Sequence, residues 1–330
     1  MTLPRSLPHI DPAIALLFEH SGLTPLDLKG RTLLPVVQGG MGVGVSANKL
    51  AGSVAALGGV GTISSVDLRR HHPDLMERMR GMNVGEAAKR GINAANLEAL
   101  QREIGAARKH SQGRGLLAIN VMRAVSEYGP SVKRALECGI DAVVVGAGVP
   151  LDLPDLAQDH PKVALVPILS DARGVQLVVK KWERKKRLPD AIVIEHPRLA
   201  GGHLGAAKIA DLNDPRFDFE NVIPQSLAFL RSAGIEKEIP LIAAGGIRSY
   251  EDIARVQALG AAAAQLGTPF AVTEEGDAHL EFKRVLAEAT DEDMAPRPST
   301  AWRNAACATA WRGGVSSAST ASSPPRCAAM

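Results

Sequence analysis

Short apolar runs recur along the chain, and each ends in Gly, Ser, Asn or a charged residue. Every run has the length of a strand and is almost continuously hydrophobic, as parallel strands covered by helices require. Eight runs share this pattern: LLPVVQ (33–38), GVGTIS (59–64), LLAINV (116–121), DAVVVG (141–146), ALVPILS (164–170), AIVIE (191–195), PLIAAGG (240–246) and AAAQLGT (262–268). The pattern predicts eight parallel strands.

Helical patterns lie between these runs. Residues 46–57 begin with Ser46, which we predict as an N-cap, and residues 252–259 end before Gly260, a normal helix stop. Residues 171–187 place four apolar side chains on one stripe: Val175, Val178, Val179 and Trp182. Because strand and helix alternate throughout, we expect a (β/α)8 barrel of the TIM type.

Two connections are longer than such a barrel needs. Residues 65–115 and 202–239 carry extra sequence with helical character, so we predict helical insertions after strands two and six, at the active-site mouth. We divide the chain into a lead segment (1–30), the barrel (31–294) and a low-complexity tail (295–330). The composition of the tail predicts disorder and is also typical of an out-of-frame ending.

The composition of the chain argues against several classes of partner and site. The chain has 330 residues, a net charge of only +3 and 3% aromatic residues, so we expect neither a nucleic-acid nor a membrane partner. Its three cysteines, Cys138, Cys307 and Cys327, lack metal-ligand spacing and predict no metal site and no disulfide framework. The N-terminus lacks a signal-peptide pattern, and we therefore predict a cytoplasmic protein.

Glycine-rich or polar residues follow several of the predicted strands. Gly39, Gly40 and Met41 follow strand one, where glycines let the backbone approach a flat ligand closely. Asn120 ends strand three, and its amide can both donate and accept toward a polar ring edge. Any one of these glycines is also explained by a tight turn leaving a strand.

The ends of strands seven and eight are the strongest signal, because barrels often bind phosphate there with backbone N–H groups and a short helix N-terminus. The residues concerned are Gly245, Gly246, Gln265, Leu266, Gly267 and Thr268. Together with the loop after strand one, they favour a cofactor that carries phosphate.

The loop after strand six holds Gly201, Gly202 and His203. His203 lies beside the expected ligand, and an imidazole with an ordinary pKa of about 6.5 can take or give a proton at neutral pH. We predict His203 as the catalytic residue and His196, on the same loop, as a cofactor contact. The other histidines are interpreted as structural or exposed: His9, His20, His71, His72, His110, His160 and His279.

Five motifs resemble the nitronate monooxygenase family, formerly called 2-nitropropane dioxygenases, which includes related NAD(P)H-dependent flavin reductases. They are QGGMGVGVS (38–46), AIN (118–120), AGGHLG (200–205), AAGGI (243–247) and QLGT (265–268). The resemblance runs from about residue 33 to about residue 292, and the order and spacing of the motifs make it specific.

The resemblance implies a TIM barrel with non-covalently bound FMN. Asn120 would contact the isoalloxazine, and the glycine turns after strands six, seven and eight would hold the ribityl phosphate. His203 matches the histidine that assists oxidation of a nitronate or nitroalkane by O2 to a carbonyl compound and nitrite. One departure is Leu199, which stands where the family commonly has an acidic residue.

Two other functions stay open. One is NAD(P)H-dependent reduction of a quinone or an enoyl thioester on the same cofactor. The other is a barrel that binds a phosphorylated ligand without redox chemistry. We expect a monomer or a homodimer. Chemistry like that of inosine monophosphate dehydrogenase is excluded because it needs a loop cysteine, and none lies between Cys138 and Cys307.

Overall fold

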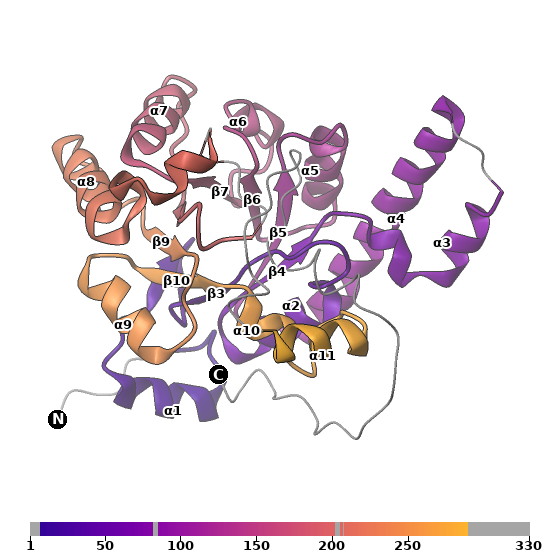
Figure 1. Ribbon diagram of the computed structural model, residues 1–330, viewed down its shortest axis with the longest axis horizontal. Coiled ribbons are helices and arrows are strands. Elements are labelled where there is room, and N and C mark those ends of the chain that lie inside the picture. The colour runs from indigo at the N-terminus through magenta and orange to yellow at the C-terminus, as the bar shows by residue number, and fades with distance from the viewer. Residues whose placement is uncertain (1–6, 82–84, 202–204, 207, 290–330) are drawn as a thin grey trace.

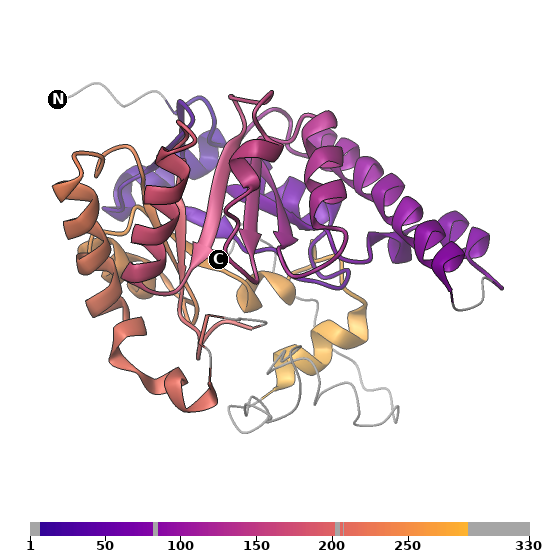
Figure 2. The ribbon, with the colours of Figure 1, turned by 90° about the horizontal axis from the view of Figure 1, so that it is seen from above.

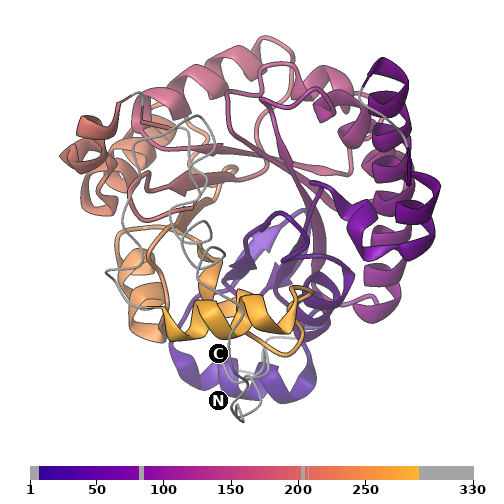
Figure 3. The same cartoon turned by 45° about the vertical axis from the view of Figure 1, so that its right-hand side comes forward.

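In the computed structural model, which describes residues 7–81, 85–201, 205–206 and 208–289, eight parallel strands close into a barrel surrounded by helices (Figures 1 and 3). Each strand pairs with the next in sequence, and the last pairs with the first. Their bounds are β3 (Val36–Gln38), β4 (Val60–Ser64), β5 (Leu116–Met122), β6 (Ala142–Gly146), β7 (Ala164–Leu169), β8 (Ile192–Glu195), β9 (Leu241–Ala244) and β10 (Ala263–Leu266). All eight predicted strands and the TIM-barrel fold are confirmed.

The strands read as continuous apolar runs because both of their faces are buried. In β5, Leu116 and Ala118 belong to the core inside the barrel, whereas Leu117, Ile119 and Val121 belong to the layer between strands and helices. Such strands cannot alternate apolar and polar residues. The barrel thus has one apolar core inside the strands and another between the strands and the helices.

The helices surround the strands (Figure 3). They are α1 (Pro12–Ser21), α2 (Asn48–Leu57), α5 (Tyr128–Glu137), α6 (Leu153–Leu156), α7 (Ala172–Glu183), α8 (Phe219–Ser232), α9 (Tyr250–Ala258), α10 (Thr268–Ala271) and α11 (Leu280–Glu288). The predicted apolar stripe of α7 is buried, including Trp182, whose indole N–H donates to the Pro150 carbonyl at 3.1 Å. The helix predicted to end before Gly260 is α9, whose N-cap Ser249 forms a capping box with Asp252.

One predicted cap is wrong. Helix α2 begins at Asn48 with Ala47 as its N-cap residue, and Ser46 does not cap it. Instead the Ser46 hydroxyl accepts the N–H of Met41 at 2.8 Å, which closes the preceding loop on itself. The groups that satisfy the start of α2 come from distant parts of the chain and are described below.

Both predicted insertions are confirmed as helical. After β4 the chain forms η1 (Leu68–His71), α3 (Pro73–Arg78) and the 25-residue helix α4 (Glu86–His110). Helix α3 and the first part of α4 extend away from the barrel (Figures 1 and 2), whereas the second half of α4 buries Ala99, Leu100 and Ile104. After β8 two 3-10 helices precede α8, η2 (Ile209–Asn213) and η3 (Pro215–Phe217).

An antiparallel hairpin that the sequence did not predict closes the amino end of the barrel. Strands β1 (Leu26–Leu28) and β2 (Arg31–Leu33) pair with each other, so the apolar run 33–38 is divided between β2 and β3. Leu26, Leu28 and Leu33 join the core inside the barrel and are buried. The hairpin is therefore an apolar plug.

None of the described helices combines the length and the apolar character that a membrane crossing requires. The predicted tail, residues 295–330, lies outside the described residues. The division of the chain into a lead segment, a barrel and a tail stays a prediction.

Candidate active site

The predicted site residues that the structure describes all lie at the carboxyl end of the barrel. They are Gly39, Gly40 and Met41 after β3, Asn120 in β5, His196 and Gly201 after β8, Gly245 and Gly246 after β9, and Gln265, Leu266, Gly267 and Thr268 at the end of β10 and after it. The remaining two, Gly202 and His203, lie outside the described residues. Segments far apart in sequence thus share one rim.

The loop after β3 packs directly against two other strand ends. A methyl group added at Gly40 would lie 2.3 Å from Cβ of Asn120, and one added at Gly39 would lie 3.2 Å from the Gln265 side chain. The Gly39 N–H also donates to the Leu266 carbonyl at 2.8 Å. At Gly40 only glycine leaves room for this approach, and at Gly39 a larger residue would have to displace the Gln265 side chain slightly. The loop, β5 and β10 thus meet closely.

The side-chain amides of Asn120 and Gln265 are half-buried, and neither has a hydrogen-bond partner among the described residues. The nearby Gln38 differs, because its Oε1 accepts the Thr62 N–H at 2.8 Å and its Nε2 donates to the Gly39 carbonyl. Asn120 and Gln265 therefore have free donors and acceptors for a polar ligand at the rim.

The turns after β8 and β9 touch each other. Gly245 and Gly246 have positive φ angles, 109° and 71°, which favour glycine. A methyl group at Gly245 would meet Cβ of His196 at 3.2 Å, and one at Gly246 would meet the Leu199 side chain at 2.9 Å. Leu199 itself is an exposed apolar side chain at this rim.

His196 ties the loop after β8 to the start of α8. Its Nε2 lies 3.5 Å from the Asp218 carboxylate, and its ring meets Phe219 edge-on with the centroids 5.9 Å apart. Its Nδ1 accepts the Arg198 N–H at 3.2 Å. Burial lowers the pKa of His196, although Asp218 opposes this by favouring the charged form. The ring contacts described here are internal to the protein, and the role of His196 as a cofactor contact stays a prediction.

Helix α10 begins at Thr268, directly after β10, with Gly267 as its N-cap residue. Thr268 is exposed at the rim, and a methyl group at Gly267 would lie 3.6 Å from Sδ of Met41. The short helix expected near strand eight is thus present. The ends of β8, β9, β10 and β3 form a continuous arc, as neighbouring strands of the barrel.

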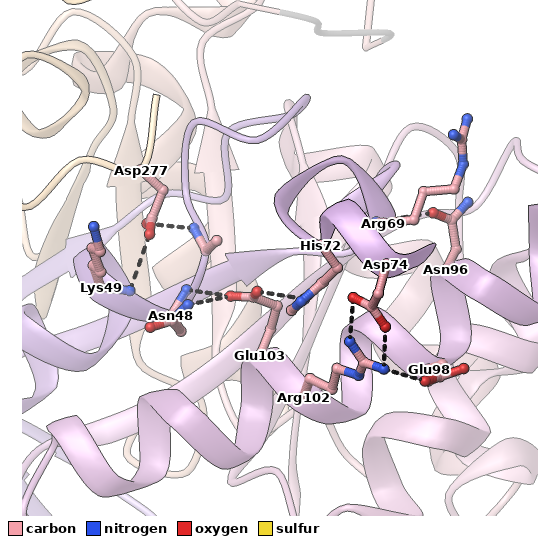
Figure 4. Close-up of polar contacts among 11 residues, drawn as sticks. Asn48, Lys49, Arg69, His72, Asp74, Asn96, Glu98, Arg102, Glu103 and Asp277 are labelled. Carbon is pink, nitrogen blue, oxygen red and sulfur yellow. Dashed lines mark hydrogen bonds and ion pairs between the residues drawn. The ribbon is translucent and has the colours of Figure 1, made fainter. Parts of the chain in front are cut away.

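These features fit a planar polar cofactor with an anionic end. Glycine turns leave the backbone accessible, unpartnered amides can bind a ring edge, and turns followed by a helix start can bind phosphate through N–H groups. Sequence reasoning missed two residues that shape the rim, Asp277 and Glu103, which bind the start of α2 (Figure 4). No local motif marks them, because their partners lie far away in the sequence.

Comparison with known proteins identifies the family. The sequence model of the family described as nitronate monooxygenase matches residues 27–298. A probable nitronate monooxygenase of Bacillus subtilis (strain 168) is 26% identical over 265 residues, which cover 78% of this chain and 72% of the relative. A probable nitronate monooxygenase of Staphylococcus haemolyticus (strain JCSC1435) is 31% identical over 103 residues, covering 31% of this chain and 27% of the relative.

Solved structures agree on the fold. Nitroalkane oxidase from Streptomyces ansochromogenes superposes with a TM-score of 0.57 at 21% identity, covering 80% of this chain and 72% of the other. FabK from Thermotoga maritima gives a TM-score of 0.56 at 21% identity, covering 79% and 67%. At such identities the likeness shows the fold alone. Because the family model matches most of the chain, this protein belongs to the nitronate monooxygenase family and is a flavin-dependent oxidoreductase.

Proposed function

We propose that this protein uses FMN to oxidise alkyl nitronates, and the nitroalkanes that give rise to them, with O2 to a carbonyl compound and nitrite. The observation that carries the proposal is the meeting of the loop after β3 with Asn120 and Gln265, whose amides have no partner among the described residues. Family membership supports the reaction class.

Different residues of the chain would bind different parts of the flavin. Asn120 and Gln265 would bind polar atoms of the isoalloxazine, while Gly39 and Gly40 let the backbone approach the ring. The N–H groups near Gly246 and Gly267, with the hydroxyl of Thr268, would bind the phosphate, which selects FMN over riboflavin. When bound, the flavin supplies an electron acceptor for the nitronate.

His203 would act as the base that removes the α-proton of a neutral nitroalkane. It follows Gly201 on the loop after β8, and His196 fastens the first part of that loop to Asp218 and Phe219. A base within hydrogen-bond reach of the proton it removes contributes about 100-fold or more to the rate. This role rests on the sequence motif, because His203 lies outside the described residues.

Replacing His203 tests its role. In His203→Asn, FMN should stay bound, and turnover of neutral nitroalkanes should fall about a hundredfold or more. Turnover of pre-formed nitronates should fall much less, because their proton is already gone. Equal losses with the two substrates would contradict the role of a base.

The reaction itself is tested by anaerobic stopped-flow mixing of the flavin-loaded enzyme. We expect propyl-2-nitronate to reduce the flavin rapidly. Rapid reduction by NADH, with none by the nitronate, would favour the NAD(P)H-dependent reductase acting on quinones or enoyl thioesters. A purified protein that neither carries nor takes up FMN would contradict the proposed cofactor.

A further inference from the structure

The start of α2 is satisfied entirely by carboxylates from other parts of the chain. The first N–H groups of a helix have no partner within the helix. Here the N–H groups of Ala47, Lys49 and Leu50 donate to the carboxylate of Asp277, at 2.8, 3.2 and 3.1 Å. Figure 4 shows the bond between Asp277 and Lys49. The Asn48 N–H donates to Glu103 at 2.8 Å. Two negative charges at this end also suit the helix dipole.

The two carboxylates belong to segments that lie far apart in the sequence. Asp277 lies between α10 and α11, 230 residues beyond Ala47. Glu103 belongs to α4, is 1% exposed, and also accepts from Nδ2 of Asn48 at 2.7 Å and contacts Nε2 of His72 at 2.9 Å. The C-terminal segment and the insertion after β4 therefore meet at one helix end.

The surroundings of Asp277 favour the protonated form of its carboxyl group. Burial raises its pKa, with the charge of Glu103 acting in the same direction, while the N–H donors of α2 lower it. Lys283 of α11 is the buried cation nearby, and its ammonium donates to the Glu274 carbonyl at 3.1 Å. Lys49 and Glu275 also contribute to the field at this point. The half-buried carboxyl group of Asp277 is held here by its hydrogen bonds with the start of α2.

Those contacts continue into the loop that carries the predicted cofactor residues. The backbone N–H of Asp277 donates to the Val45 carbonyl at 3.2 Å, so Asp277 binds the chain on both sides of Ser46. Ser46 in turn pairs with Met41, because its N–H donates to the Met41 carbonyl at 3.0 Å and its hydroxyl accepts the Met41 N–H at 2.8 Å. Met41 directly follows Gly40, which packs on Asn120.

We propose that Asp277 is a positioning residue for the flavin: it fixes the start of α2 and, through Val45 and Ser46, the loop that faces the cofactor. Glu103 supports it by binding Asn48. Asp277 acts through the backbone and touches no reacting atom. The inference rests on the proposed cofactor site, and it predicts that flavin affinity depends on a side chain that sequence motifs do not mark.

The test compares Asp277 with a carboxylate that caps a different helix. Asp277→Asn keeps the shape of the side chain but turns an N–H donor toward the helix N–H groups. The matched control is Asp11→Asn: Asp11 caps α1, pairs with Arg114, and donates its N–H to the carbonyl of Leu57 at the far end of α2. Three quantities are measured on the flavin-stripped full chain: the Kd for FMN, the unfolding temperature, and amide hydrogen exchange over residues 39–50.

We expect Asp277→Asn to weaken FMN binding by about tenfold and to speed exchange over residues 39–46, because the substitution removes a negative charge at the helix N-terminus and turns a donor toward N–H groups that need an acceptor. Asp11→Asn, in which asparagine can still cap α1, should leave the Kd within about twofold. Wild-type affinity in Asp277→Asn, or equal affinity losses in both variants, would overturn the proposal. Asp277→Ala, which removes the carboxylate without adding a donor, should give the same pattern.

Hydrogen exchange separates this proposal from the proposed function. If wild-type protein does not bind FMN but Asp277→Asn still speeds exchange over residues 39–46, the loop positioning holds and the cofactor proposal fails. If exchange over the loop is unchanged in Asp277→Asn, the positioning role fails whatever the cofactor.

Discussion

The two ends of the barrel differ in the residues that cover them. At the amino end, the hairpin β1–β2 inserts Leu26, Leu28 and Leu33 into the core, and these side chains are buried. At the carboxyl end, glycine turns meet Asn120 and Gln265, whose amides have no partner among the described residues. The amino end of the barrel is therefore closed by apolar side chains of the hairpin, whereas the carboxyl end carries polar side chains and glycine turns, the division expected of this fold.

A depression at the amino end of the barrel also differs from the carboxyl-end rim. It has a volume of about 510 Å³ and lies between the hairpin, the end of α8 and the starts of β9 and β10. Three of the four charged residues that line it are already engaged: Arg231 pairs with Glu236 at 2.6 Å, and the Asp27 carboxylate accepts from Thr32 at 2.7 Å, while Lys237 is the fourth. Polar groups that satisfy each other gain little from a ligand, so concavity alone does not mark a site here.

The largest expected effect is a loss of stability when the apolar plug formed by the hairpin is weakened. Leu26→Ala should lower the free energy of unfolding by about 2–5 kcal/mol, because Leu26 is fully buried and the truncation leaves a cavity. FMN affinity should not change, since the plug lies at the opposite end. Leu17→Ala, at a position 68% exposed on α1, is the control and should change stability by less than about 0.5 kcal/mol. A parallel loss of FMN affinity in Leu26→Ala would break the division between the ends.

A smaller effect, confined to binding, is expected at the other end. Gly40→Ala should weaken FMN binding by about tenfold to a hundredfold, because the added methyl group would lie 2.3 Å from Cβ of Asn120 and must displace the loop or the amide. Gly105→Ala, in α4 where the added methyl group meets nothing within 4 Å, is the matched control. Fluorescence titration with FMN measures both, and equal affinities would contradict the account.

The smallest effect concerns the pH dependence of stability. Burial lowers the pKa of His196 below the ordinary 6.5, so the native state binds its proton less readily than the unfolded chain. The stability that this neutral histidine contributes is present above about pH 6.5 and is lost as the pH falls toward the lowered value. His196→Asn should therefore show a shallower fall in the denaturant midpoint between about pH 7.5 and pH 5.5. Identical slopes in variant and wild type would contradict this.

The barrel could be predicted from sequence because strands buried on both faces leave a continuous local signal, as β5 does. The glycine turns were found for the same reason, since each directly follows such a run. The hairpin was missed because strands of three residues, such as Leu26–Leu28, are too short to establish a pattern. The start of α2 was wrong because Ser46 is the usual local cap, whereas the actual acceptor, Asp277, is recruited by tertiary packing.

A structure of the protein with FMN bound would show directly where the flavin lies. We expect the isoalloxazine beside Asn120 and Gln265, with the phosphate at the turns of Gly246 and Gly267. A flavin bound anywhere else, for instance in the depression lined by Arg231 and Glu236, would contradict this expectation.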